Sequence, residues 1–288
     1  MNKRFLQLAK QFWIVFVFAV ALVYLVNNSD DLYAQLRVIG WPRILGSLSF
    51  LLIAKFLLVE VSRQSVEVVA NKPLFGRMLY VYALSQLAKY LPGGVWHFVG
   101  RAGYYHGQGL SARQSAQAML VENVWLVMSA AFVGGIFFAL YALAGVSLLV
   151  IPLLVISWWA ALYAVTRWRI VSLSASKHSL ILLLQLTIWV ALGAALWVLM
   201  VEEESGFFFL CIGAFSLSWL VGYVSVFAPG GLGVREGVLV VIFATLLSPS
   251  EVAIYVSVNR IIWIVGEIIL AITALLIFNT SRNSMQSA

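Results

Sequence analysis

The sequence predicts an all-α polytopic membrane protein with about six full spanning helices and two helical hairpins that proline and glycine interrupt. Hydrophobic residues make up 63% of the chain and charged residues 10%, whereas a soluble domain is about half apolar and a quarter charged. Apolar runs close to the roughly 20 residues that cross a bilayer recur along the chain. Two further apolar regions each contain a PGG motif. These observations exclude a single-pass or a peripheral membrane protein.

The first expected helix covers residues 11–27, within an N-terminal segment of helix and loop that ends at residue 43. Its basic start and apolar stretch resemble a signal peptide, but the NNSDD that follows has no small-residue cleavage pattern. We therefore expect a retained membrane helix.

Five more spanning helices are expected from the apolar runs, at residues 44–62, 116–143, 146–165, 180–201 and 252–278. The interrupted apolar regions are 78–110, broken by LPGG, and 207–247, broken by APGG. The polar gaps are too short to fold alone, so residues 1–288 are expected to form one integral membrane domain. Small residues in AAFVGG, at Ala130–Gly135, are expected to allow close helix packing.

Lysine and arginine predict the orientation, because they are enriched in cytoplasmic loops. On this rule, with the crossings counted, both termini and residues 63–77, 101–115 and 167–177 are cytoplasmic, whereas Glu202–Glu204 are external. The net charge of +7 is then explained by membrane orientation rather than by nucleic-acid binding.

The same count predicts two re-entrant hairpins. If residues 63–77 and 101–115 lie on one side, the segment between them must enter the membrane and return. Residues 207–247 must likewise begin and end outside. Segments broken by proline and glycine at corresponding places in two halves are typical of inverted-repeat transporters. The candidate repeats are residues 44–165 and 180–278.

Each PGG break is expected to form an anion site. Proline ends a helix and glycine permits positive φ, while non-helical backbone at membrane depth survives only in buried or watery surroundings. The helix that restarts presents free N–H groups and its positive dipole end, which favour phosphate. Arg101, His97 and Arg235 are expected to add side-chain donors. The expected backbone donors are at Gly93, Gly94, Gly230, Gly231 and Gly233.

A simpler alternative is that each PGG is only a tight turn. Arg235 would then be an arginine that reaches the membrane interface.

Charged residues within apolar runs form a second group of candidates. A charge at the centre of a membrane helix costs about 2.5–3.5 kcal/mol, so such residues should face protein, water or one another. Arg260 and Glu267 share one face of the last helix. Structural ion pairs would explain these charges nearly as well as a binding site. The candidates are Lys89, Glu122, Glu236, Arg260 and Glu267.

Lys55 and Glu60 lie nearer a predicted helix end. We expect a structural role for both, with side chains that reach the membrane surface.

No cofactor, metal or catalytic site is expected. His97 and His106 have no Cys or Asp at ligand spacing, and the chain contains no GxxxxGK[ST] nucleotide motif. Cys211 is the one cysteine, so no intrachain disulfide can form.

The pair LAKYLPGGVWHFVGR and PGGLGVREG resembles the transmembrane region of lysylphosphatidylglycerol synthases, over about residues 75–280. This region is the flippase-like domain of the bacterial multiple peptide resistance factor. The resemblance implies movement of aminoacylated phosphatidylglycerol between leaflets or, as in relatives, a link to envelope-glycan assembly. The full synthases also carry a soluble aminoacyl-transferase domain after this region. The chain ends at Ala288, so that activity is not expected. The matched motif residues are Lys89, Pro92, Gly93, Gly94, Arg101, Pro229, Gly230, Gly231, Gly233, Arg235, Glu236 and Gly237.

The function expected from these features is lipid transport of the flippase type, without catalysis, in the inner membrane of a bacterium. Arg101, Arg235 and Arg260 would hold a headgroup phosphate, and nearby glutamates would balance them or bind a headgroup amine. One alternative is a membrane enzyme acting on a polyprenyl-phosphate substrate, which would need acidic metal-binding clusters. Another is a non-catalytic partner of a separate synthase or glycan-assembly enzyme. Assembly of several copies of the chain is also left open.

Overall fold

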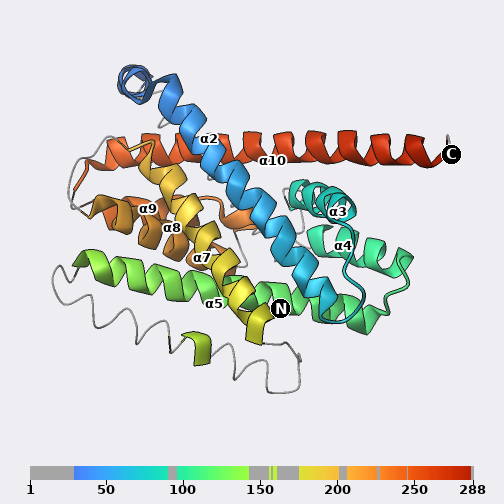
Figure 1. Cartoon of the computed structure of the whole chain (residues 1–288). Helices are drawn as coiled ribbons and strands as arrows, with labels where there is room; N and C mark the ends of the chain where they lie inside the picture. The colour runs from blue at the N-terminus through green and yellow to red at the C-terminus, as the bar shows by residue number, and fades with distance from the viewer. Residues whose placement is uncertain are drawn as a thin grey trace, which may run out of the picture.

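The computed structural model describes residues 29–89, 96–142, 156, 158–160, 175–200, 206–225, 228–244 and 246–286. Every regular element in these ranges is a helix, so the predicted all-α class is confirmed for the described residues (Figure 1). The elements are α2 (Ser29–Glu67), α3 (Phe75–Ala88), α4 (Trp96–Gly107), α5 (Ala112–Ala142), α7 (Ala175–Trp197), α8 (Phe207–Val224), the 3₁₀ turn η2 (Pro229–Gly231), α9 (Val234–Phe243) and α10 (Pro249–Gln286).

Five of these helices are long and apolar enough to cross a membrane, which makes the chain an integral membrane protein. Four of them coincide with predicted spans: Arg37–Glu67 and Pro249–Phe278 contain those at 44–62 and 252–278, whereas Ala112–Tyr141 and Ser176–Trp197 cover most of those at 116–143 and 180–201. The fifth, Phe207–Val224, is the first arm of the second predicted hairpin. The predicted spans at 11–27 and 146–165 lie outside the described residues, apart from helical positions 156 and 158–160.

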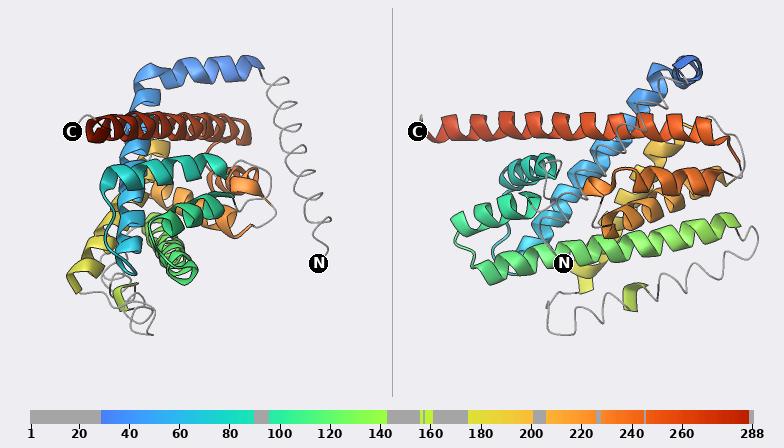
Figure 2. Two further views of the ribbon diagram at one scale, coloured as in Figure 1. Left: turned by 90° about the vertical axis from the view of Figure 1, so that its right-hand side faces the viewer. Right: turned by 180° about the vertical axis from the view of Figure 1, so that it is seen from behind.

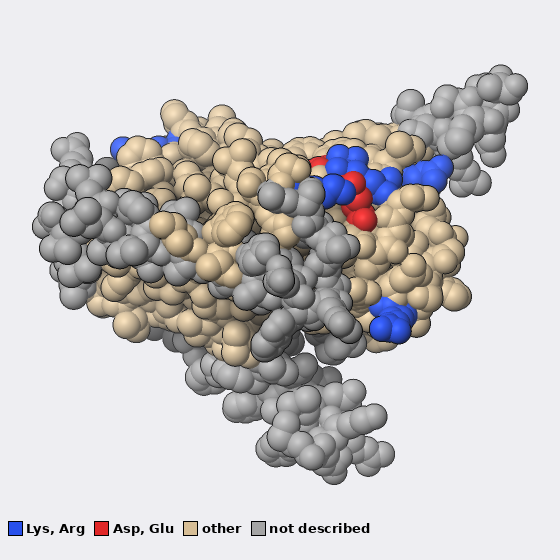
Figure 3. Space-filling model, turned by 60° about the horizontal axis from the view of Figure 1, so that its bottom comes forward, with Lys and Arg blue, Asp and Glu red and all other residues tan. Residues whose placement is uncertain are grey.

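The outer surface suits a lipid environment. Trp41, Val241 and Leu276 are among many large apolar side chains that are well exposed. On the face shown in Figure 3, the charged side chains of the described residues gather mainly toward the end that α3 and α4 occupy, and most of the remaining described surface carries none. Such a surface is expected where hydrocarbon rather than water covers the protein.

In two pairs of consecutive helices, the end of the second helix lies near the start of the first. The α3–α4 pair begins and ends beside one cavity, and Gln114 after α4 donates a hydrogen bond to the carbonyl of Val69 before α3, at 3.1 Å. In the α8–α9 pair, the ring of Phe207 at the start lies 5.6 Å from the ring of Phe243 at the end. Both pairs are therefore hairpins in space.

The second break has the backbone that the PGG motif predicts. α8 ends at Val224, and α9 begins at Val234 after the 3₁₀ turn. Gly230, Gly231 and Gly233 have φ of +62°, +71° and +79°, in the left-handed region where a residue with a Cβ is strained. The first break, with Pro92, Gly93 and Gly94, lies outside the described residues.

The packing of one half has a counterpart in the other. Each half contains a long helix, a hairpin and a long helix: α2, α3–α4, α5 in the first, and α7, α8–α9, α10 in the second. The first long helices, α2 and α7, pack on each other; α5 packs on α8 as α10 packs on α3. The long helices α5 and α10 run in opposite directions (Figures 1 and 2).

Even the helix starts correspond. At the start of α5, the amide of Gln114 donates to the Ser111 hydroxyl, and Gln114 Oε1 accepts from the Ser111 amide at 2.9 Å. At the start of α10, Ser248 and Glu251 make the same reciprocal pair, with the Ser248 amide donating at 3.0 Å. Both are capping boxes, which satisfy N–H groups that the first helical turn leaves unpaired.

Candidate functional site

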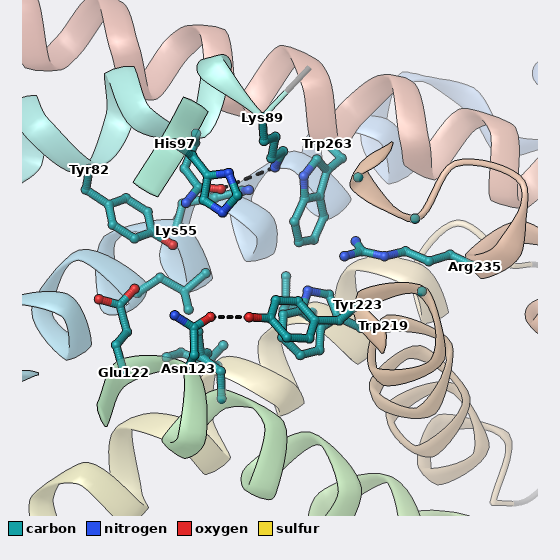
Figure 4. Close-up of a pocket in the computed structure, with 18 of the residues that line it drawn as sticks. Lys55, Tyr82, Lys89, His97, Glu122, Asn123, Trp219, Tyr223, Arg235 and Trp263 are labelled. Atoms are coloured by element: carbon teal, nitrogen blue, oxygen red, sulfur yellow. Dashed lines mark hydrogen bonds between the residues drawn. The ribbon is translucent and has the colours of Figure 1, made fainter. Parts of the chain in front are cut away.

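A cavity of about 440 Å³ lies where the two hairpins meet the long helices (Figure 4). All eight α-helices that the structure describes, and the turn η2, contribute to its wall. The first hairpin supplies Lys89, His97 and Arg101. The second break supplies Gly230, Gly231 and Arg235. The two interrupted segments, far apart in the sequence, thus face one space.

The Arg101–Glu122 pair forms one polar wall of the cavity. Arg101 from α4 and Glu122 from α5 are 3% and 4% exposed. One guanidinium nitrogen donates to Glu122 Oε1 at 2.9 Å, and the other donates to Glu122 Oε2, to Ser62 and to the Tyr105 hydroxyl. The Ser62 hydroxyl in turn donates to Glu122 at 2.8 Å. This two-pronged pairing is the strong geometry for arginine and carboxylate.

Two lysines that line another part of the cavity share one carboxylate, that of Glu267. Lys55 of α2, at 1% exposure, donates to Glu267 Oε1 of α10 at 2.5 Å, and Lys89 donates to the same oxygen. The indole of Trp263 is a third donor to that oxygen, at 2.8 Å. The Lys55 ammonium also lies 3.7 Å from the centre of the Trp263 ring, within cation–π range.

Arg235 enters the cavity from the first turn of α9 (Figure 4). Its guanidinium carbon lies 5.6 Å from the centre of the Trp219 ring and 5.8 Å from that of Trp263. Two glycines make room for its stem. A Cβ on Gly231 would lie 2.8 Å from Arg235 Nε, and one on Gly222 would overlap the Arg235 side chain. Arg235 is therefore held between aromatic faces, directly beside the glycines of the break.

Arg260 and Glu236 support the break from outside the cavity wall. Arg260 donates to the carbonyl of Gly230 at 3.0 Å, and its Nε lies 3.6 Å from a Glu236 oxygen. A residue of α10 is thus tied to both the turn and the start of α9. Arg260 and Glu267, which were predicted to share a face of α10, contact different residues. Arg260 contacts Gly230 and Glu236, whereas Glu267 contacts Lys55 and Lys89.

The structure brings together most of the residues that the sequence singled out. Lys89, His97, Arg101, Glu122, Gly230, Gly231 and Arg235 line the cavity. Glu267 and Arg260 contact lining residues without being part of the wall, and Glu236 lies behind them, 3.6 Å from Arg260. Gly233 is the residue before α9 and does not line the cavity. Gly93 and Gly94 lie outside the described residues.

The structural role expected for Lys55 agrees with its ion pair to Glu267, but the expectation that its side chain reaches the membrane surface is wrong. Lys55 does not reach the membrane surface but is buried in the middle of the candidate span Arg37–Glu67, level with Glu267. The predicted span at 44–62 placed it too close to a helix end. Glu60 agrees with its expected structural role, since Arg63 donates to it at 2.7 Å.

Sequence reasoning also missed the neutral part of the wall. Tyr223 donates to the amide oxygen of Asn123 at 2.5 Å, and its ring stacks on Trp219 with centres 4.9 Å apart. Tyr82 and Gln86 add polar groups from α3. Aromatic residues make up 14% of the chain, so nothing in the sequence distinguished these from lipid-facing ones.

The site carries more basic than acidic groups. Lys55, Lys89, Arg101, Arg235 and Arg260 are its five basic side chains, against the three carboxylates of Glu122, Glu236 and Glu267. The arrangement suits an anion that can accept hydrogen bonds from arginine, lysine and backbone groups. No three His, Cys, Asp or Glu side chains gather as a metal site would need within the described ranges.

A scan against protein-family models found no match, and a search of curated proteins found no similar sequence. The resemblance to the membrane region of lysylphosphatidylglycerol synthases therefore stays a prediction from its two motifs.

Proposed function

We propose that the protein is a flippase-like transporter that moves a phosphate-headgroup lipid between the leaflets of a bacterial inner membrane, without changing the lipid chemically. One observation carries this proposal. A cavity with basic and aromatic walls lies inside a bundle of membrane-length helices, at the place where two broken hairpins meet.

A lipid headgroup needs such a place to cross. A phosphate charge is costly to bring into about 30 Å of hydrocarbon unless protein groups replace its water. Lys55, Lys89 and Arg235 offer donors within the bundle. At about 440 Å³ the cavity has the size of a small-ligand site. It suits a headgroup, while the acyl chains remain in lipid.

Arg235 is the proposed main contact of the phosphate. It is placed between two indole rings, beside glycines that let an anion approach the backbone. Its planar guanidinium can hold two phosphate oxygens at once. Arg101, also predicted as a phosphate ligand, is already held by Glu122, Ser62 and Tyr105. We therefore assign Arg101 to shaping the cavity.

The proposed architecture is an inverted repeat with six spans and two re-entrant hairpins. The matching packing of the two halves and the opposite directions of α5 and α10 support it. The spans at 11–27 and 146–165 would complete the six. In transporters of this kind the substrate site lies between the repeats near the bilayer midplane, and the repeats rock around it.

The proposed sidedness has support at one end of the bundle. Lys177 at the start of α7 lies 2.7 Å from Glu67 at the end of α2, and Lys72 lies 3.1 Å from Glu67. These residues come from two segments that the Lys and Arg distribution makes cytoplasmic. Both termini are proposed to lie on that side.

A liposome assay tests this function. The purified protein is reconstituted with a trace of phosphatidylglycerol that carries a dithionite-sensitive fluorophore on an acyl chain, and dithionite is added to bleach label in the outer leaflet. We expect bleaching to continue beyond the outer leaflet with the wild type and with the exposed-site control Arg113→Ala. Bleaching that stops where it stops in protein-free liposomes would refute transport of this lipid.

A further inference from the structure

The three carboxylates of the site are all engaged by the protein's own cations. Glu122 pairs with Arg101, and Glu267 pairs with both Lys55 and Lys89. Glu236 lies 3.6 Å from Arg260. A headgroup ammonium that entered the cavity would therefore meet carboxylates whose charge a basic side chain of the protein already balances.

Aromatic faces are the other groups that bind an ammonium, and those of Trp263 and Trp219 already face cations of the protein. Lys55 lies 3.7 Å from the centre of the Trp263 ring, and the Arg235 guanidinium carbon lies 5.6 Å from that of Trp219. The indole rings thus contact cations of the protein. An added ammonium would meet like charges on both sides of the cavity, which is costly in a site of low dielectric.

The charge of the site favours the opposite kind of ligand. Its five basic and three acidic side chains leave an excess of positive charge in a largely buried place. Uncompensated charge is unfavourable there, so a ligand of negative charge stabilises the site as it binds. Uncharged polar side chains of Tyr82, Gln86 and Asn123 complete the wall and suit hydroxyl groups of a headgroup.

We infer that the cavity selects lipids whose phosphate headgroup has a net negative charge and no ammonium group. Phosphatidylglycerol has such a headgroup. Zwitterionic phosphatidylethanolamine and cationic lysylphosphatidylglycerol do not. This inference rests on the proposed transport function and names the substrate class of the same site.

Competition in the same liposomes tests the inference. Labelled phosphatidylglycerol is kept at trace level in phosphatidylcholine, and an excess of one unlabelled lipid is added: phosphatidylglycerol, phosphatidylethanolamine or lysylphosphatidylglycerol. We expect unlabelled phosphatidylglycerol to slow transport of the label at about tenfold lower concentration than the other two, the effect of losing one charge-assisted hydrogen bond. The variant Lys89→Gln, which removes one positive charge from the wall and leaves Arg235 in place, should reduce this preference, while Arg113→Gln should retain it.

The outcomes separate this inference from the function. If lysylphosphatidylglycerol competes as well as phosphatidylglycerol while the label still moves, transport stands and the charge selection is overturned. If Lys89→Gln, folded as judged by gel filtration, keeps the full preference, the positive charge of this cavity does not select the lipid and the inference is overturned. If no labelled lipid moves with the wild type, the transport function itself fails.

Discussion

At the scale of single residues, two buried carboxylates on different helices organise the charges around the cavity. Glu122 and Glu267 stood out because a charge inside an apolar run is costly. Their partners are Arg101 and Lys55, on other helices. No sequence spacing relates residues that meet only after helices pack, so these pairs could not be predicted. The depth of Lys55 was misjudged because it depends on where α2 enters the membrane.

Glu267→Gln should destabilise the protein strongly. The substitution leaves the buried ammonium of Lys55 and the partly buried one of Lys89 without their shared carboxylate. Breaking a buried ion pair in this way costs about 3–5 kcal/mol. Glu60→Gln is the control, because Glu60 is partly exposed and its pairs should contribute about 1 kcal/mol or less. Denaturant unfolding in detergent, followed by tryptophan fluorescence, compares the two. Equal midpoints would show that the Lys55–Glu267–Lys89 cluster adds no stability.

Gly231→Val should abolish transport while leaving a folded protein. Gly231 has φ of +71°, which a β-branched residue disfavours, and a Cβ there would lie 2.8 Å from Arg235 Nε. The side chain of Arg235 would be pushed from its place between the indole rings. Gly135→Val is the control, since a Cβ at Gly135 meets nothing within 4 Å. The liposome assay measures both, and normal transport by Gly231→Val would contradict the role of this glycine.

At the scale of helices, the second PGG motif predicted its own local structure well. The proline and the three glycines predicted a break in the helix with positive φ at the glycines, and the observed φ values agree. The close packing of α5 through AAFVGG was predicted, but not which of its two glycines makes the contact. Within AAFVGG, a Cβ on Gly134 would lie 2.8 Å from Leu217 of α8, but one on Gly135 has open space. The motif indicates a packing face, whereas the facing helix decides which glycine is essential.

Gly213→Ala should weaken the contact between α5 and α8. A Cβ at Gly213 would come within 2.7 Å of the backbone nitrogen of Phe138, and backbone cannot move aside as a side chain can. Gly135→Ala makes the same chemical change in a helix without that contact. The expected difference in free energy of unfolding is about 1–3 kcal/mol, the cost of overpacking a well-packed site. Indistinguishable unfolding curves would mean that the two helices tolerate a wider separation.

At the scale of the whole molecule, charge distribution and the two breaks predicted a repeated organisation. The structure shows matching packing in the two halves, with α5 and α10 in opposite directions. What the sequence could not supply is the composition of the cavity. Every described α-helix contributes residues to its wall. The aromatic residues that face the cavity cannot be distinguished by sequence from those that face lipid.

Cysteine labelling tests the opposite orientation of the halves. Ala112 and Pro249 are exposed and stand at the first position of α5 and α10. Arg113 and Glu251 beside them favour an aqueous setting. We expect Ala112→Cys to resist a membrane-impermeant thiol reagent in intact cells and Pro249→Cys to react. The native Cys211 is buried and should give little background. After permeabilisation both should react. Labelling of Ala112→Cys in intact cells would refute the inverted arrangement.

The central claim is that the cavity beside the second break holds the lipid phosphate during transport. The most direct measurement is the rate of labelled phosphatidylglycerol movement in liposomes for wild type, Arg235→Lys and Arg235→Ala, each checked for folding by gel filtration. Arg235→Ala should be inactive. Arg235→Lys should recover part of the rate, because it loses one of two charge-assisted hydrogen bonds, each worth about 1.5–3 kcal/mol. Transport by folded Arg235→Ala at the wild-type rate would contradict the claim and place the path of the headgroup elsewhere.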